Sequence, residues 1–133
     1  MKIIIILLQS VISIIIGQTL FFKFTGAPES IYIFSTLGVE PWGRIALGTM
    51  ELLSIILLWI PRTTIYALIL IVGMMSGAIA SHLFVLGIEI RGDKGELFML
   101  GLITWVSAAV LLISKREEVK ALCLKFLAKK HAL

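Results

Sequence analysis

Residues 41–60 read PWGRIALGTMELLSIILLWI, an apolar run that is long enough to cross a bilayer and carries Glu51 near its middle. About 20 residues of α-helix, at a rise of 1.5 Å each, span the roughly 30 Å hydrocarbon core. A carboxylate at that depth costs about 2.5–3.5 kcal/mol on insertion scales, so it is expected to face the protein interior. The stretch therefore predicts a membrane helix with a functional or structural acidic site on its inner face.

The composition indicates a membrane protein. Of the 133 residues, 59% are hydrophobic and 15% are charged, and the mean hydropathy is +1.09. Soluble domains carry about 25% charged residues, and a soluble chain of this length could not bury so much apolar surface. We expect one all-α integral membrane domain whose main partner is the lipid bilayer. The net charge of +4 arises mostly from C-terminal lysines, so no nucleic-acid partner is expected.

The hydrophobic runs predict four membrane helices that form one bundle over residues 1–113. A turn as short as Pro61-Arg62 makes its flanking helices an antiparallel hairpin. The first run follows Lys2 without a small-x-small cleavage pattern, so we expect a retained helix rather than a signal peptide. The expected spans are residues 3–22, 42–60, 63–86 and 96–113.

Two further segments lie outside these spans. Between the first and second span, Pro28 suits a first helical turn and Gly38 suits a helix stop, which predicts a short interfacial helix. Residues 114–133 return to charge, and two interpretations of this tail stay open. It is either a basic amphipathic helix on an anionic leaflet or a solvated, frayed end of the last span.

The distribution of basic residues predicts the orientation. Four spans place both ends of the chain and the 61–62 turn on one side, which carries eight of the twelve Lys and Arg residues. Because cytoplasmic loops are enriched in Lys and Arg, both termini are predicted to be cytoplasmic. The eight are Lys2, Arg62, Lys115, Arg116, Lys120, Lys125, Lys129 and Lys130, and the other four are Lys23, Arg44, Arg91 and Lys94.

Polar residues gather in the half of the bundle opposite the termini. Gln18 and His82 lie about 6 Å inside that surface, and Lys23 and Arg44 lie at its rim. Arg44 and Glu51 are about 10 Å apart along their helix, too far for a direct ion pair. Glu51 therefore needs a partner from another helix, with Lys23, Gln18 and His82 as candidates. We predict these five residues as a ligand-binding set, although Gln18 can merely bridge helices and Lys23 can merely snorkel.

Other kinds of site have little support in the sequence. No nucleophile–base pair is visible, so no catalytic residue is assigned and an autonomous enzyme is the least supported class. No metal or haem site is evident, because His82 is the only histidine of the predicted bundle, while His131 lies in the tail. Cys123 is the one cysteine, which excludes an internal disulfide or a Cys-X-X-Cys redox centre.

Gly73, Gly77 and Ser81 recur at positions i, i+4 and i+8 of the third predicted span. This small-xxx-small pattern lets two membrane helices approach closely, so we assign these residues to helix packing. It makes a homo-oligomer, or contact with another membrane protein, an expected interaction. Small residues are also common in membrane helices, and that second interpretation stays open.

Several motifs together resemble the DoxX-like family of small four-helix bacterial membrane proteins. The resemblance covers about residues 8–113 and implies a four-helix bundle in the bacterial inner membrane. It carries over five motif residues: Lys23, Glu29, Arg44, Glu51 and His82. The motifs are LQS at 8–10, FKFTGAPE at 22–29, LGVEPWGRIALGTMELL at 37–53, GAIASHLFVLGI at 77–88 and GELF at 95–98.

Three functional hypotheses follow. Members and relatives of the family are linked to quinone and thiol redox systems, and distant eukaryotic relatives resemble cargo receptors or assembly chaperones. The first hypothesis is an accessory subunit of a membrane redox system that binds a small amphipathic ligand, such as a quinone or an isoprenoid-like lipid. The second is a small proton-coupled transporter that uses Glu51. The third is a chaperone or interaction subunit that docks through the Gly73, Gly77, Ser81 stripe.

Overall fold

The structure, a computed structural model, describes residues 2–132. Met1, the first residue of the predicted bundle, and Leu133, the last residue of the predicted tail, lie outside the described residues. The predicted all-helical class is confirmed: six α-helices and one π-helical turn, and no strand, occur within residues 2–132. These elements are α1 (Lys2–Thr25), α2 (Pro28–Thr36), α3 (Trp42–Leu58), α4 (Thr64–Ser81), η1 (His82–Leu86), α5 (Glu96–Ser114) and α6 (Arg116–Ala132).

Three helical segments are long and apolar enough to cross a membrane. They are α1, the continuous α4–η1 segment Thr64–Leu86, and α5. Helix α3 has 17 residues and ends at Leu58, two residues before its predicted end, in a tight turn ahead of Pro61. Conversely, α1 continues three residues past its predicted end, because the helix stops only where Gly26 takes a φ of 68°.

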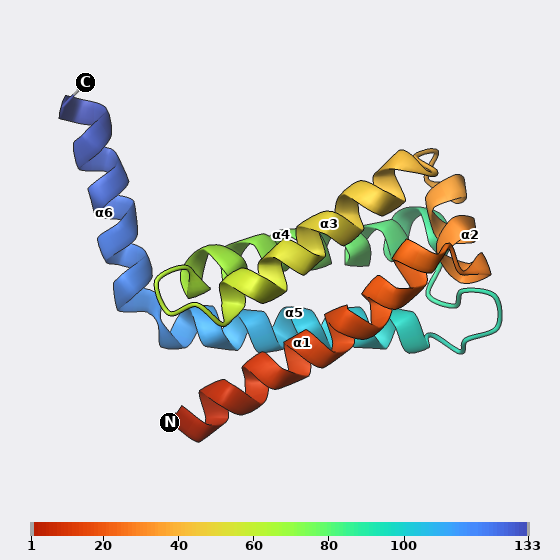
Figure 1. The fold of residues 1–133 in the computed structure, drawn as a ribbon, viewed down its shortest axis with the longest axis horizontal. Helices are drawn as coiled ribbons and strands as arrows, with labels where there is room; N and C mark the ends of the chain where they lie inside the picture. The colour runs from red at the N-terminus through yellow and green to blue at the C-terminus, as the bar shows by residue number, and fades with distance from the viewer. Residues whose placement is uncertain (1, 133) are drawn as a thin grey trace.

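The four long helices lie side by side (Figure 1). Helix α1 packs on α3 and α5, and α4 packs on the same two helices, so α3 and α5 bridge α1 and α4. The N-terminus, the α3–α4 turn and the start of α6 lie at one end of the molecule, and α2 lies at the other. Helix α6 contacts α5 and then turns away from the remaining helices, with Leu124 and Phe126 exposed.

The core fills the half of the molecule near the N-terminus, which we call the packed half. Its polar groups are bonded as well: the carbonyl oxygen of Leu58 accepts from Gln9 Nε2 at 3.0 Å and from the Thr64 hydroxyl at 3.1 Å. Trp59 Nε1 donates to the hydroxyl of Ser13 at 2.8 Å. We define the packed half by its buried apolar residues Ile12, Leu58, Ala67, Leu68, Ile71, Ala108 and Leu111.

Helix α2 closes the opposite end. It is present where the sequence predicts a short helix, and Pro28 is its first residue. Its buried residues are Ser30 and Phe34, and it packs against α1, α3 and η1. Helix α2 therefore covers the space between the ends of α1, α3 and η1 that lie away from the N-terminus.

Candidate functional site

A cavity of about 680 Å³ occupies the half of the molecule under α2, which we call the hollow half. Residues of α1, α2, α4, η1 and α5 form its walls, and Leu47 and Glu51 of α3 complete them. Most lining side chains are apolar, and the ionisable ones are Lys23, Glu29, Glu51, His82, Asp93 and Glu96. Four of the five residues predicted as a ligand-binding set thus border one cavity.

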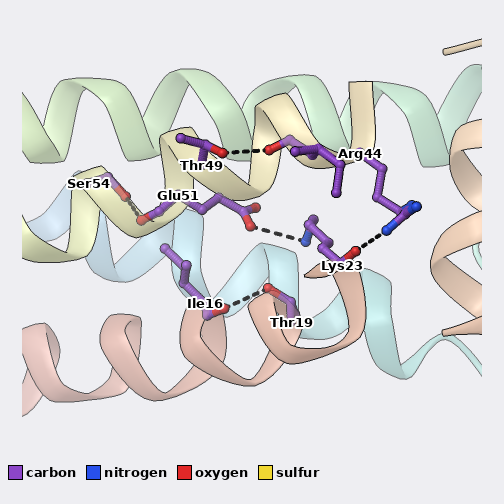
Figure 2. A network of polar contacts seen from close by, with 8 residues as sticks. Ile16, Thr19, Lys23, Arg44, Thr49, Glu51 and Ser54 are labelled. Carbon is purple, nitrogen blue, oxygen red and sulfur yellow. Dashed lines mark hydrogen bonds and ion pairs between the residues drawn. The ribbon is translucent and has the colours of Figure 1, made fainter. Parts of the chain in front are cut away.

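A buried ion pair joins α1 to α3 on the cavity wall (Figure 2). Every third or fourth residue of α3 is buried, and Glu51 belongs to that inward face, with 2% of its surface exposed. Lys23 Nζ lies 3.1 Å from Glu51 Oε2, which makes Lys23 the partner among the three expected candidates. Apart from this ammonium group, Oε2 has no hydrogen-bond partner in the described part of the chain.

Arg44, which was predicted as a ligand-binding residue, does not line the cavity. Its Nε donates to both carboxylate oxygens of Glu40, at 2.9 and 3.0 Å, and its Nη1 donates to the carbonyl of Lys23. Arg44 therefore ties the last turn of α1 to the first turn of α3. Glu40 was not singled out from the sequence; it lies two residues before α3, so this ion pair forms in the turn that leads into the helix.

Gly48 explains why α1 and α3 approach so closely here. A Cβ at this position would lie 3.1 Å from the ring of Phe24 and 3.6 Å from Cβ of Lys23. The missing side chain lets the backbone of α3 pass directly over these two residues. Lys23 can then reach Glu51, which lies one turn beyond Gly48 on the same face of α3.

His82 is buried at the point where α4 becomes the π-helical turn η1. Its Nδ1 lies 2.9 Å from the carbonyl oxygen of Gly87, and its ring packs edge-on against Phe98 with centroids 5.5 Å apart. A carbonyl oxygen only accepts, so Nδ1 carries a proton. No hydrogen bond joins His82 to Glu51, although both line the cavity. Short π-helical segments are rare and often occur at functional sites.

The remaining predicted residues also border the cavity. Gln18 lies on the α1 wall with an exposed side chain, and Gly73, Gly77 and Ser81 lie on the α4 wall. A Cβ added at Gly73 or Gly77 would meet no atom within 4 Å. Within the described chain, this stripe faces open space rather than another helix. Its contact with a partner helix stays a prediction.

Asp93 organises the cavity rim and was not singled out from the sequence. Its Oδ1 accepts from the backbone N–H groups of Ile90 (2.9 Å) and Gly95 (2.8 Å), and its Oδ2 accepts from that of Leu97 (3.2 Å). Partial desolvation favours the neutral carboxyl, but these bonds and nearby His82 outweigh it and lower the pKa of Asp93 from 3.8. An aspartate before the glycine and glutamate that open α5 is a typical capping signal.

The cavity does not present a metal centre. Among residues 2–132, no group of three or more His, Cys, Asp and Glu side chains is placed to hold a metal ion. Backbone N–H groups hold Asp93, and the contact of His82 with the Gly87 carbonyl uses Nδ1 and leaves its second ring nitrogen free. The cavity thus combines an apolar wall, a buried ion pair and a rim of carboxylates.

The three long apolar helical segments are those of a membrane protein. The sequence model of the DoxX-like family matches residues 7–91, so the chain belongs to the DoxX-like family, and the predicted resemblance is confirmed. The match ends before α5, so the GELF motif at 95–98 lies outside it. No curated protein and no solved structure matches the chain.

Proposed function

We propose that α1, α3, the α4–η1 segment and α5 form a transmembrane four-helix bundle in a bacterial inner membrane. The 17 residues of α3 are just long enough to span, and exposed Trp42 and Trp59 flank them as interfacial anchors. Both termini are cytoplasmic in this arrangement, because the end that holds α6 carries eight of the twelve basic residues. Helix α2 then lies at the outer interface.

Within that bundle, the protein acts as an accessory subunit that binds a small amphipathic ligand. One observation carries this proposal: a cavity of about 680 Å³ is bordered by a buried ion pair in which Lys23 is the one partner of Glu51 Oε2 among the described residues. Ligand sites usually have volumes of about 300–1,000 Å³, apolar walls and a few polar groups that fix orientation. A quinone or an isoprenoid-like lipid has the matching shape, with one polar end and an apolar body.

The binding role requires no chemistry from this chain. The cavity holds no nucleophile with an adjacent base, and Lys23 and Glu51 are engaged with each other. A redox enzyme or another membrane protein would use the ligand that this subunit holds. The hollow half would then bind and orient the ligand, and the partner protein would carry out any reaction.

Native mass spectrometry of the protein extracted in a mild detergent tests this function. We expect the wild type to retain a lipid-like small molecule and Gly77→Leu, which projects a side chain into the cavity, to lose it. Ala80→Leu is the matched control, because Ala80 lies on α4 outside the cavity lining. Equal retention by all three proteins, or no adduct on any of them, would contradict the proposal.

A proton-coupled transporter is the second candidate, because Glu51 is a buried carboxylate on the wall of a cavity. One membrane carboxylate can exchange a proton for a cation. Proton-driven flux in proteoliposomes that stops in Glu51→Gln would favour transport, and flux that is absent from the wild type would favour binding. A chaperone role through the Gly73 and Gly77 stripe would place a partner helix across the cavity that these residues border.

A further inference from the structure

We propose that the cavity prefers an amphiphile whose polar end is a cation, such as an alkylammonium, over neutral or anionic amphiphiles of the same chain length. This inference rests on the proposed binding function and narrows its ligand class away from quinones, whose head groups only accept hydrogen bonds. It is drawn from the charges that line the cavity and from the buried Glu51 Oε2, whose one partner among the described residues is Lys23.

Acidic groups dominate the cavity lining. Four carboxylates stand against one ammonium group, that of Lys23. Arg44 adds no free charge, because it pairs with Glu40 outside the lining. The loop residues Arg91 and Lys94 are exposed and also lie outside the lining. The four carboxylates are Glu29, Glu51, Asp93 and Glu96.

The single ammonium group is already neutralised. Lys23 and Glu51 lie 3.1 Å apart and together carry no net charge. Three carboxylates therefore remain without a matching cation in the lining: Glu29, Asp93 and Glu96. Because concave sites lined by one sign of charge focus the field, we expect a negative potential at the cavity rim, where Glu29 and Glu96 are exposed.

Hydrogen bonding favours the same kind of ligand. Glu51 Oε2 can only accept and is buried, and within the described residues the Lys23 ammonium at 3.1 Å is the one donor group near it. His82 uses Nδ1 toward Gly87, so its second ring nitrogen is left as an acceptor in the neutral ring. An ammonium head supplies three donors and a hydroxyl supplies one. A quinone carbonyl or a carboxylate supplies none, so the expected order of affinity is ammonium, hydroxyl, then acceptor-only and anionic heads.

Lys23 does not reverse this order. An anionic head that bound Lys23 would have to share it with Glu51, only 3.1 Å away. A buried carboxylate that loses its cation strongly destabilises the folded protein. An ammonium head instead adds a second cation beside Glu51 and leaves the ion pair in place.

The test uses three probes with one common chain: dodecylammonium, dodecanol and dodecanoate. The measurement is each probe's affinity, from the shift of the thermal unfolding midpoint with concentration, for the detergent-solubilised full chain. Gly77→Leu, whose cavity is filled, is measured in parallel to subtract effects of the probes on the micelle. We expect dodecylammonium to bind about tenfold more tightly than dodecanol, a difference of about 1.4 kcal/mol, and dodecanoate to bind most weakly.

The double variant Glu29→Gln/Glu96→Gln keeps the buried ion pair and removes two exposed carboxylates, so it is expected to fold. It should lose most of the preference for dodecylammonium over dodecanol. Equal affinities for the three probes, a preference for dodecanoate, or an unchanged preference in the double variant would overturn this inference but not the binding function. If no probe binds in a way that Gly77→Leu abolishes, both fall.

Discussion

The packed half and the hollow half are built from the same four long helices but fill their space differently. In the packed half, side chains such as Leu68 and Leu111 are fully buried, and the carbonyl of Leu58 accepts two hydrogen bonds. In the hollow half, the helices enclose about 680 Å³ of cavity, and Lys23 is the one partner of Glu51 Oε2 among the described residues. A protein optimised only for stability would fill the second half as it fills the first.

The difference begins with residue size along α4. Toward its N-terminus, Leu68 and Ile71 project into the core, whereas Gly73 and Gly77 leave space at the far end. Membrane helices associate mainly through van der Waals packing, so a cavity between them sacrifices contacts that would hold them together. The comparison indicates that the packing that stabilises the fold is concentrated in the packed half, while the hollow half offers the space that the proposed binding function requires.

The largest effect is expected from breaking the ion pair. Lys23→Met leaves the buried carboxylate of Glu51 without a cation, and such changes cost about 3–5 kcal/mol of unfolding free energy. The measurement is reversible unfolding in mixed micelles. The double variant Lys23→Met/Glu51→Met should recover most of the loss, because it removes both charges. A single variant as stable as the wild type would show that the pair does not hold α1 to α3.

The next largest effect compares one substitution in the two halves. Leu68→Ala opens a void in filled space and should cost about 2–5 kcal/mol. Leu47→Ala only enlarges a cavity that already exists, so its cost should be clearly smaller. Unfolding free energies of the two variants, measured side by side, check this. Equal losses would mean that the two halves are packed alike.

Asp93→Asn should cost about 1 kcal/mol, because hydrogen bonds to an ionised carboxylate are about twice as strong as those to a neutral amide. The pKa of Asp93 is lower in the folded protein than its ordinary value of 3.8. Its contribution is therefore complete above pH 3.8 and declines as the pH falls through the folded value. Thermal unfolding across acid pH should show this decline in the wild type and not in Asp93→Asn. If the wild type and Asp93→Asn lose stability equally as the pH falls, titratable groups other than Asp93 cause the loss.

The smallest effects separate two helical glycines. At Gly77 an added Cβ meets nothing, so Gly77→Ala should raise stability by about 0.5–1 kcal/mol through the gain in helix propensity. At Gly48 the Cβ lies 3.1 Å from the Phe24 ring, so Gly48→Ala should gain nothing or lose stability. The measurement is the thermal unfolding midpoint of each variant. If Gly48→Ala is more stable than Gly77→Ala, α1 and α3 do not approach each other as closely as described here.

Helix positions and the inward direction of Glu51 could be predicted from the sequence, because apolar runs and an intramembrane carboxylate each permit few solutions. Lys23 was one of three candidate partners, and the choice depended on the approach of α1 to α3 at Gly48. Arg44 was placed in the ligand set, but it lies outside the cavity lining and binds Glu40. Such pairings depend on helix rotation and separation, which the sequence pattern does not specify.

The α4 stripe shows the same limit. Its spacing predicts one face of a helix, and that face exists, but spacing alone cannot tell a packed face from a cavity wall. Asp93 was missed for another reason: its role comes from three backbone N–H groups in an irregular loop. Such local geometry leaves only the weak sequence signal of an aspartate before a helix.

The most direct test of the hollow half is the reactivity of a single cysteine on α4. In a Cys123→Ala background, Gly77→Cys and Ala80→Cys are labelled with a water-soluble maleimide in native membranes. The account predicts that Gly77→Cys, on the cavity wall, reacts and is shielded by a bound amphiphile, while Ala80→Cys, outside the cavity, does not react. A Gly77→Cys protein as unreactive as Ala80→Cys, with or without amphiphile, would contradict it.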